Sequence, residues 1–203
     1  MRYVVGIDEV GRGALAGPVV VAAAAVPRNP RLKIYNAGVG RLRDSKKLTA
    51  KQREKWFHYI TRHPEIDYAV ARVYPRSIER MNISRAANLA AERAFVKLTT
   101  NYQLLATSNV YLDGGLYVGN KNKIAHARTI VRGDEKYKVV KLASIMAKVS
   151  RDRMMMRLAK KYPHYGFEMH KGYGTKRHFA AIKKHGPSKA HRLTFLKNYY
   201  KIK

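Results

Sequence analysis

The sequence predicts an α/β fold in which a β-sheet is flanked by helices. Short apolar runs rich in β-branched residues, of which residues 3–7 and 109–112 are the clearest, alternate with longer stretches whose apolar residues recur at helical spacing. The length of 203 residues suits one domain, and a hydrophobic content of 46% is enough to form a core. We therefore expect residues 1–203 to fold as a single domain.

Apolar runs bounded by Gly, Pro, Asp or Asn predict the extended segments. They cover residues 3–7, 18–26, 31–35, 68–73 and 109–112. The glycine-rich Gly11-Arg12-Gly13 joins the first two, which indicates a strand, a loop and a returning strand. The segment at 109–112 ends on Asp113-Gly114-Gly115, and Ile130-Val131 further along leads into Gly133-Asp134.

Apolar residues three and four positions apart predict the helices. They cover residues 48–63, 77–98 and 142–159. Thr49 is expected to cap the first helix, and Pro163 follows the third. The third helix carries an apolar stripe made of Leu142, Ile145, Met146, Val149, Met156 and Ala159. Residues from about 160 onward, rich in Lys, His and Tyr, predict a basic helical extension packed beside the sheet and its helices.

The chain is strongly basic. It has 42 Lys and Arg against 13 Asp and Glu, a formal net charge of +29, and residues 121–203 alone hold 23 basic and 4 acidic side chains. Such an excess favours a polyanionic partner, most often nucleic acid, because each phosphate that is neutralised releases condensed counterions. The C-terminal part is therefore the expected docking surface. A solvated basic surface typical of ribosomal proteins explains the charge equally well.

Composition excludes several classes of chemistry. The absence of cysteine removes disulfides, thiolate zinc sites, iron–sulfur clusters and cysteine nucleophiles. The longest wholly apolar run, residues 19–26, is far shorter than the roughly 20 residues that span a bilayer, and Asp8 and Glu9 stand where a signal peptide would be apolar. We expect a soluble, cytoplasmic protein without membrane contact, whose chemistry uses oxygen or imidazole groups.

Four carboxylates occupy unusual positions in this basic chain. Asp8, Glu9 and Asp113 end apolar strands, and Asp134 lies in a glycine turn. Carboxylates there are poorly solvated unless a cation meets them, and a cluster of oxygen ligands without sulfur favours Mg²⁺ or Mn²⁺. In a protein that binds nucleic acid, such a cluster suggests metal-assisted hydrolysis of phosphodiesters.

Each of these acids also has a plainer interpretation. An ordinary salt bridge to a basic side chain is the alternative, and Asp134 taken alone favours it. Adjacent residues of a strand point to opposite faces, so Asp8 and Glu9 share a site only if the backbone departs from regular pleating there. Gly6, Gly11 and Gly13 would permit that departure. Of two further acids, Asp152 is expected in an ion pair, whereas a role in the site and a role as the cap of the helix that follows explain Asp44 equally well.

Motifs in a fixed order resemble ribonuclease HII, the type 2 ribonuclease H family. They are Gly6-Ile7-Asp8-Glu9-Val10-Gly11-Arg12-Gly13, Gly17-Pro18-Val19-Val20, Asp44-Ser45-Lys46-Lys47-Leu48, Leu112-Asp113-Gly114, Gly133-Asp134, residues 143–152 and residues 165–175. They span nearly the whole chain. The resemblance implies a ribonuclease H-like mixed β-sheet flanked by helices, with a C-terminal helical extension that helps to hold a duplex.

The resemblance also implies an activity. Asp8, Glu9, Asp113 and Asp134 correspond to the catalytic, metal-binding carboxylates, which would hold Mg²⁺ or Mn²⁺. In the family's two-metal scheme, one ion lowers the pKa of the attacking water and the other stabilises the departing 3′ oxygen. The implied reactions are hydrolysis of RNA in RNA/DNA hybrids and cleavage 5′ of single ribonucleotides in duplex DNA, as part of ribonucleotide excision repair.

Substrate-binding residues follow from the same resemblance. Gly11-Arg12-Gly13 corresponds to the loop whose backbone approaches ribose 2′-hydroxyls, and Tyr173 to the tyrosine that packs on the deoxyribose next to the ribonucleotide. Lys46 and Lys148 are candidate phosphate contacts, with solvated lysines as the alternative. Lys141 departs from the family, which more often has a small apolar residue there.

The C-terminus has part of a partner-binding pattern. Leu196-Lys197-Asn198-Tyr199-Tyr200 has the spacing of the hydrophobic part of a sliding-clamp binding peptide. Leu193 replaces the glutamine that begins that motif, so we expect at most a weak clamp contact and favour a packed or frayed terminus. A monomer is the expected state.

Other functions stay open at this point. A noncatalytic basic RNA-binding or ribosomal-type protein would explain the charge but would leave the four carboxylates without a purpose. A metal-free ribonuclease would need paired imidazoles and would be insensitive to EDTA; its candidates are His164, His170, His178, His185 and His191. Ribonuclease HIII carries an extra N-terminal domain, whereas the first strand here begins at residue 3, which favours ribonuclease HII.

Overall fold

The computed structural model describes residues 3–28, 38–100, 109–119 and 127–197. Its sheet has the strand order β3-β2-β1-β4-β5. The strands are β1 (Tyr3–Val10), β2 (Val19–Pro27), β3 (Asp67–Val73), β4 (Asn109–Asp113) and β5 (Ala127–Ile130). The β1–β2 and β2–β3 pairs are antiparallel, whereas β1–β4 and β4–β5 are parallel. The expected mixed sheet is confirmed, and the segment expected near residues 31–35 lies outside the described residues.

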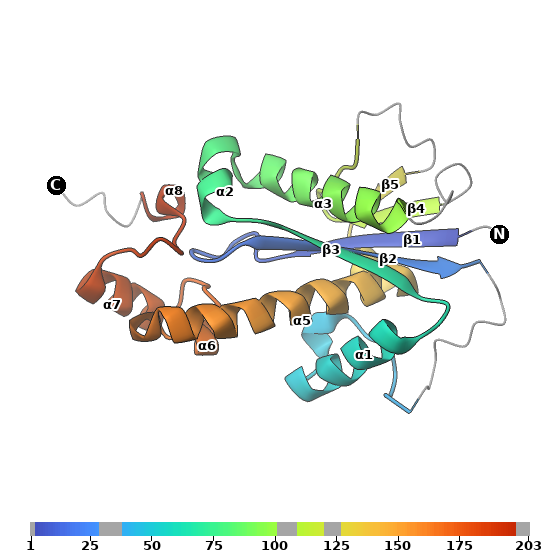
Figure 1. Ribbon diagram of the computed structural model, residues 1–203, viewed down its shortest axis with the longest axis horizontal. Helices are drawn as coiled ribbons and strands as arrows, with labels where there is room; N and C mark the ends of the chain where they lie inside the picture. The colour runs from blue at the N-terminus through green and yellow to red at the C-terminus, as the bar shows by residue number, and fades with distance from the viewer. Residues whose placement is uncertain (1–2, 29–37, 101–108, 120–126, 198–203) are drawn as a thin grey trace.

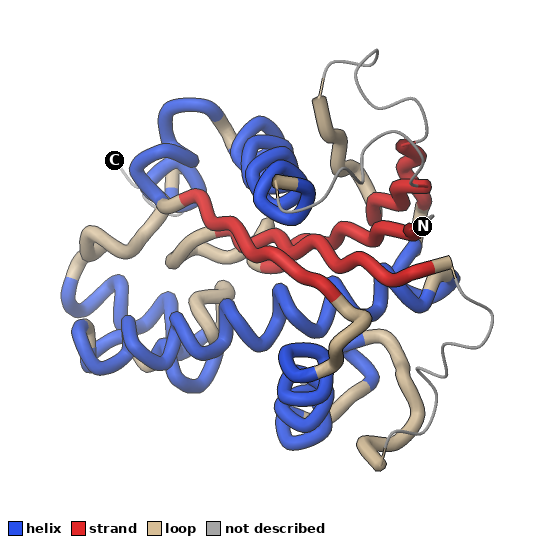
Figure 2. Tube along the Cα trace, turned by 45° about the vertical axis from the view of Figure 1, so that its right-hand side comes forward, coloured by secondary structure: helices blue, strands red, loops and turns tan. Residues whose placement is uncertain are grey.

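Helices cover both faces of the sheet (Figures 1 and 2). On one face lie α1 (Ala50–Arg62) and α5 (Lys138–Lys161), and on the other α2 (Pro75–Met81) and α3 (Ile83–Thr99). Side chains alternate along β1, so Val5 and Ile7 pack in the core with α3, whereas Val4 packs in the core with α5. Among the described helices, none combines the length and apolar character that a membrane crossing requires.

The strand β1 is more regular than the sequence suggested. It stays paired with β2 as far as Val10, so the departure from pleating that would let Asp8 and Glu9 share a site does not occur at these two residues. The chain leaves the strand at Gly11, where φ is +87°. Gly6 has a different purpose: a β-carbon there would overlap the backbone of Val139, so this glycine lets α5 approach the sheet closely.

The single helix predicted over residues 77–98 is two helices. Asn82 separates α2 from α3 with φ 67° and ψ 167°. Its side-chain oxygen accepts a hydrogen bond from the backbone N–H of Arg85 at 3.0 Å and so caps α3. Both helices pack on the same core, so the apolar spacing continues across the break and conceals it.

The remaining helix predictions hold with one correction. Thr49 caps α1 in a reciprocal pair with Gln52, and Asp44 caps the short 3₁₀ helix η1 (Ser45–Lys47). The prediction that Met156 belongs to the apolar stripe of α5 is wrong: Met156 is 45% exposed, and Met155 is buried instead. The stripe shifts because α5 runs past the sheet and packs Met155 into a separate C-terminal core.

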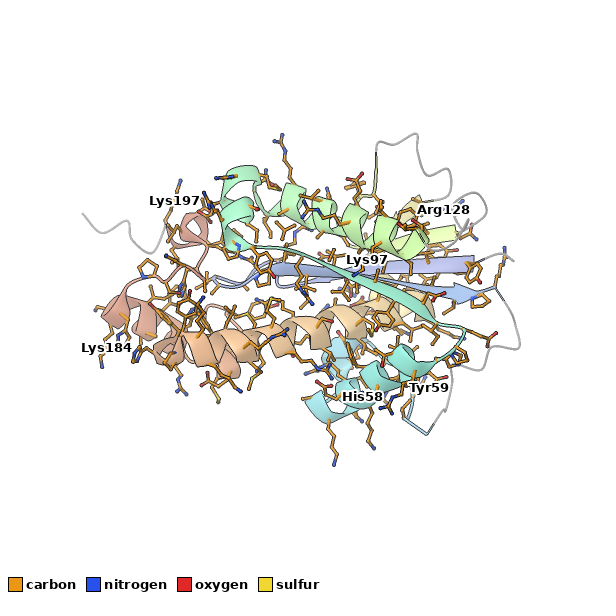
Figure 3. All side chains as sticks on the ribbon, viewed as in Figure 1. His58, Tyr59, Lys97, Arg128, Lys184 and Lys197 are labelled. Atoms are coloured by element: carbon orange, nitrogen blue, oxygen red, sulfur yellow. The ribbon has the colours of Figure 1, made fainter. Side chains whose placement is uncertain are left out.

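The C-terminal part is a helical extension, as expected. It contains η3 (Pro163–Tyr165), α6 (Phe167–His170), α7 (Lys176–His185) and α8 (Leu193–Leu196). Its small core buries Phe167 and Ile182 against Leu15 of the N-terminal loop, so the two ends of the chain pack together. Lys184 and Lys197 lie at this end of the molecule (Figure 3).

Candidate active site

Three aspartates from three elements meet beside the parallel strands β1 and β4. Ile7 lies opposite Leu112 in the β1–β4 pair, so the next residues, Asp8 and Asp113, are neighbours. Asp134 comes from α4 (Gly133–Lys136), which follows β5. One carboxylate oxygen from each aspartate lies within 4.8 Å of those of the other two. The structure therefore brings together three of the four carboxylates that the sequence singled out.

Asp113 fixes the helix that carries Asp134. Its Oδ1 accepts hydrogen bonds from the backbone N–H of Gly133 at 2.6 Å and of Asp134 at 3.4 Å. Arg132, with φ 55°, turns the chain into α4 just before this contact. The second aspartate of the cluster thus positions the third.

The cluster is electrostatically unfavourable without a cation. Burial raises the pKa of Asp8 well above its usual range, and the charges of Glu9, Asp113 and Asp134 raise it further against a hydrogen bond from Ser144. Burial, together with the charge of Asp134, also raises the pKa of Asp113. A divalent cation would relieve both effects, and a compact set of carboxylate oxygens suits a hard ion.

Glu9 lies next to this group but outside it. Its carboxylate pairs with the Arg12 guanidinium at 3.4 Å, and Arg12 also donates to the Ser84 hydroxyl on α3 at 3.0 Å. Glu9 therefore faces α3, whereas Asp8 faces α5, as expected for adjacent residues of a regular strand. Burial raises the pKa of Glu9, and among the described residues its Oε2 atom has no hydrogen-bond partner.

Lys46 places a positive charge against the cluster. Its Nζ lies 3.3 Å from Oδ2 of Asp134. The short helix η1 that carries Lys46 is held by Ser45, whose hydroxyl bonds to that of Ser144 on α5 at 2.8 Å. Burial lowers the pKa of Lys46, but the carboxylates of Asp134, Asp44 and Asp8 together more than offset this, so the pKa is raised.

Lys148 has a different partner. Its Nζ lies 2.8 Å from Oδ1 of Asp152, one helical turn further along α5. The ion pair expected for Asp152 is thus confirmed. Because Lys148 already has a carboxylate, any role in phosphate binding would require it to exchange or share that partner.

The glycine loop and Tyr173 are brought together by backbone contacts. The N–H groups of Leu15 and Ala16 both donate to the carbonyl of Gly172, at 2.8 and 3.2 Å. Gly172 has φ +82°, and a β-carbon there would lie 2.6 Å from the carbonyl oxygen of Ala16. Tyr173 follows directly, so its position is tied to the segment that begins with Gly11-Arg12-Gly13.

Two fully buried arginines hold this arrangement, and the sequence analysis missed both. Arg151 donates to the carbonyls of Ala16, Pro18 and Lys171, and Arg192 donates to those of Arg12 and Gly17. Neither has a carboxylate within ion-pair distance in the described part of the chain. No sequence signal separated them from the other basic residues, because burial on backbone carbonyls leaves no pattern in spacing.

The position of Arg151 also explains why residue 11 is a glycine. A β-carbon at Gly11 would overlap the guanidinium of Arg151, so Gly11 makes room for that side chain. Gly13 is different, because it is exposed and nothing lies within 4 Å of the position a β-carbon would take. The Arg151 guanidinium also lies 5.3 Å from the centre of the Tyr173 ring.

The histidines that a metal-free nuclease would need lie in the C-terminal part of the chain. His178 and His191 are buried and joined by an Nε2–Nε2 hydrogen bond of 3.1 Å. Nδ1 of His178 bonds to the Tyr173 carbonyl at 2.9 Å, and Nδ1 of His191 accepts from the Ser188 N–H at 2.9 Å. Burial lowers the pKa of both to about 4, so both are neutral near pH 7 and act as core residues.

The mixed five-stranded sheet with helices on both faces is a ribonuclease H-like fold. With a carboxylate cluster beside its parallel strands, this fold indicates a metal-dependent nuclease. Comparison with protein families narrows this class. Residues 5–200, nearly the whole chain, match the sequence family described as "Ribonuclease HII". The chain belongs to the ribonuclease HII family and is a metal-dependent ribonuclease.

Individual relatives agree. The chain is 46% identical over 192 residues to ribonuclease HII of Endomicrobium trichonymphae, covering 95% of this chain and 84% of that protein. It superposes on ribonuclease H2 of Pyrococcus horikoshii OT3 with a TM-score of 0.73 at 27% identity, covering 95% and 93%. The ribonuclease HII of Archaeoglobus fulgidus, solved as a complex with PCNA, gives 0.69 at 26% identity, covering 93% of each chain. Bst-RNase HIII, solved with Mn²⁺, shares the fold alone, with a TM-score of 0.72 at 22% identity over 95% and 67%.

Proposed function

We propose that this ribonuclease hydrolyses the RNA strand of RNA/DNA hybrids and cuts on the 5′ side of single ribonucleotides in duplex DNA, leaving 5′-phosphate and 3′-hydroxyl ends. Removal of misincorporated ribonucleotides in excision repair is its proposed cellular role. The observation that carries the proposal is the cluster of Asp8, Asp113 and Asp134, whose raised pKa values at Asp8 and Asp113 call for a cation.

The four carboxylates have distinct proposed roles. Asp8, Asp113 and Asp134 would hold the divalent metal, Mg²⁺ or Mn²⁺, and Glu9 would join them from the opposite face of β1 at the end of the strand. Two such ions, when bound, would supply an activated water and stabilise the departing 3′ oxygen. Lys46, whose side chain is 77% exposed, would contact a substrate phosphate while it keeps Asp134 in position. Lys148 is the weaker candidate, because it is paired with Asp152.

Selection of ribonucleotides is assigned to the glycine loop and Tyr173. The open space at Gly13 would let the backbone approach a 2′-hydroxyl, which a β-carbon would prevent. Tyr173, tied to the loop through Gly172, would pack on the neighbouring deoxyribose. The basic helical part from about residue 160 would bind the flanking duplex by contacts with phosphates.

One cleavage experiment tests the proposal. An end-labelled DNA duplex with one ribonucleotide is incubated with Mg²⁺, Mn²⁺ or EDTA, using the wild type, Asp8→Asn and the control Glu54→Gln. Glu54 forms a surface ion pair with Arg153 and is not one of the clustered carboxylates. We expect a metal-dependent cut 5′ of the ribonucleotide that Asp8→Asn abolishes and Glu54→Gln retains.

Two other outcomes would contradict it. Binding without cleavage under every metal condition would favour the noncatalytic basic RNA-binding protein. Cleavage that persists in EDTA would favour a mechanism based on imidazoles.

We also propose a weak sliding-clamp contact at the C-terminus. The PCNA complex belongs to the Archaeoglobus protein. In this chain Leu196 is buried in the C-terminal core, so its side chain is unavailable to a clamp. A contact would fall to Tyr199 and Tyr200, which lie outside the described residues. Titration of a labelled sliding clamp with the full chain and with Tyr199→Ala/Tyr200→Ala tests this, and equal affinity for both would rule it out.

A further inference from the structure

A basic hollow next to the aspartate cluster has no part in the function proposed above. It has a volume of about 270 Å³ and lies where η1 and the segment before it face α4 and α5. Four cationic side chains line it: Arg41, Arg43, Lys47 and Lys141.

The two acids of the hollow leave its positive charge uncompensated. Asp44 is buried, and its carboxylate accepts a hydrogen bond from the backbone N–H of Lys46 at 2.9 Å. Glu135 is exposed. In the described part of the chain, none of the four cations has a carboxylate within ion-pair distance. The hollow therefore favours an anion.

The hollow is lined by direct sequence neighbours of residues in and beside the aspartate cluster. Glu135 directly follows Asp134, and Lys47 directly follows Lys46, whose amine contacts Asp134. Ser45, in the same 3₁₀ helix, bonds to Ser144, which in turn donates to Asp8. Phosphates recur along each nucleic-acid strand, so a strand with one phosphate at the aspartates would carry neighbouring phosphates that a basic hollow beside the cluster could bind.

We propose that this hollow binds a backbone phosphate of the substrate that is not the one cleaved. The inference rests on the proposed function and adds a binding site to it. Arg41 and Arg43 offer planar donor pairs that match phosphate oxygens. Lys141 is half-buried in α5, so its amine has less freedom to lose on binding than that of an exposed lysine.

The salt dependence of binding tests the inference. Affinity for a ribonucleotide-containing duplex is measured in EDTA, where the proposed reaction does not proceed, at several salt concentrations. The test protein is Arg43→Ala/Lys141→Ala. The control Arg93→Ala/Lys97→Ala removes the same charge from exposed residues of α3, on the other face of the sheet (Figure 3).

One phosphate contact gives a defined change in slope. We expect the log–log salt slope of the test protein to be shallower than that of the wild type by about 1, and its affinity at low salt to be about tenfold weaker. The control should keep the wild-type slope. Equal slopes for the test protein and the wild type, or the same change in the control, would overturn the inference.

A second measurement locates the phosphate. Single neutral methylphosphonates are placed along both strands of the duplex. A methylphosphonate at one position should weaken binding by the wild type about tenfold and should not weaken binding by Arg43→Ala/Lys141→Ala. The neutral phosphonate and the double substitution would each remove the same contact, so their effects should not add. Identical position profiles for both proteins would overturn the inference. If the wild type cuts at the ribonucleotide and the profiles still match, only this site fails; if it neither binds nor cuts, the proposed function fails as well.

Discussion

Arg192 donates a hydrogen bond to the carbonyl oxygen of Arg12 at 2.9 Å, although the two residues are 180 positions apart in the sequence. Its other donors reach the carbonyl of Gly17 at 2.9 and 3.0 Å. Burial lowers the pKa of Arg192 to about 9, which still leaves the guanidinium charged at neutral pH. The loop between Arg12 and Gly17 is therefore held by a buried cation from the far end of the sequence.

Replacing Arg192 tests the importance of this contact. Arg192→Met keeps the apolar stem but leaves the carbonyls of Arg12 and Gly17 without donors, so we expect a loss of unfolding free energy of about 3 kcal/mol. Urea unfolding at pH 7 measures it. Arg157→Met, an exposed residue of α5, is the control and should change stability by less than about 0.5 kcal/mol. Similar losses in both variants would show that the buried hydrogen bonds contribute little.

Acid should destabilise the C-terminal part through its paired histidines. Burial holds the pKa of His178 and His191 at about 4, below their value of about 6.5 in the unfolded chain. The unfolded state then binds more protons, so stability is complete above pH 6.5 and falls as the pH drops toward 4, by up to roughly 3 kcal/mol per histidine.

A single variant separates this effect from general acid denaturation. His191→Gln removes one titrating ring and retains a polar side chain, so the fall in unfolding free energy between pH 7 and pH 4.5 should become smaller. His58→Gln, an exposed residue of α1, should leave it unchanged. Parallel pH profiles for the wild type and His191→Gln would mean that other groups cause the acid sensitivity.

Because the carboxylates of the aspartate cluster repel one another, we expect Asp8→Asn to be more stable than the wild type, although the proposed function predicts that it loses activity. In EDTA the raised pKa of Asp8 means that its carboxylate destabilises the fold, increasingly so as the pH rises above about 4, where the unfolded chain has lost the proton. Asp8→Asn removes that charge. We expect a higher melting temperature for this variant at pH 8 in EDTA, with a difference that shrinks at pH 5 and on adding Mn²⁺. A lower melting temperature at every pH would contradict the electrostatic account.

The aspartates of the cluster could be predicted from the sequence, but the buried arginines and the helix break could not. Asp8 and Asp113 could be identified because carboxylates rarely follow apolar strands, and the parallel pairing of those strands then makes them neighbours. Arg151 and Arg192 could not, because they lie among 42 basic residues and bind backbone carbonyls, which any sequence provides. The break at Asn82 was likewise hidden, since both flanking helices keep one apolar face.

Replacing two glycines near the site with alanine should change the stability of the protein by very different amounts. At Gly6 a β-carbon would overlap the backbone of Val139 at the start of α5, so Gly6→Ala must push that helix away from β1. We expect a loss of about 2 kcal/mol or more in unfolding free energy. Because α5 carries Ser144 against Asp8 and follows the helix of Asp134, Mn²⁺ affinity measured by calorimetry should also fall.

Gly13 has space for the same added methyl group. Nothing lies within 4 Å of its β-carbon position, and its φ is not positive, so Gly13→Ala should change stability by less than about 0.5 kcal/mol and leave Mn²⁺ affinity intact. Its effect should appear only in cleavage at a single ribonucleotide, because the methyl group would hold the sugar away from the loop backbone. Unchanged cleavage by Gly13→Ala would exclude close backbone approach at this residue. Equal destabilisation by both alanines would show that the close packing of α5 on β1 is not what requires glycine at position 6.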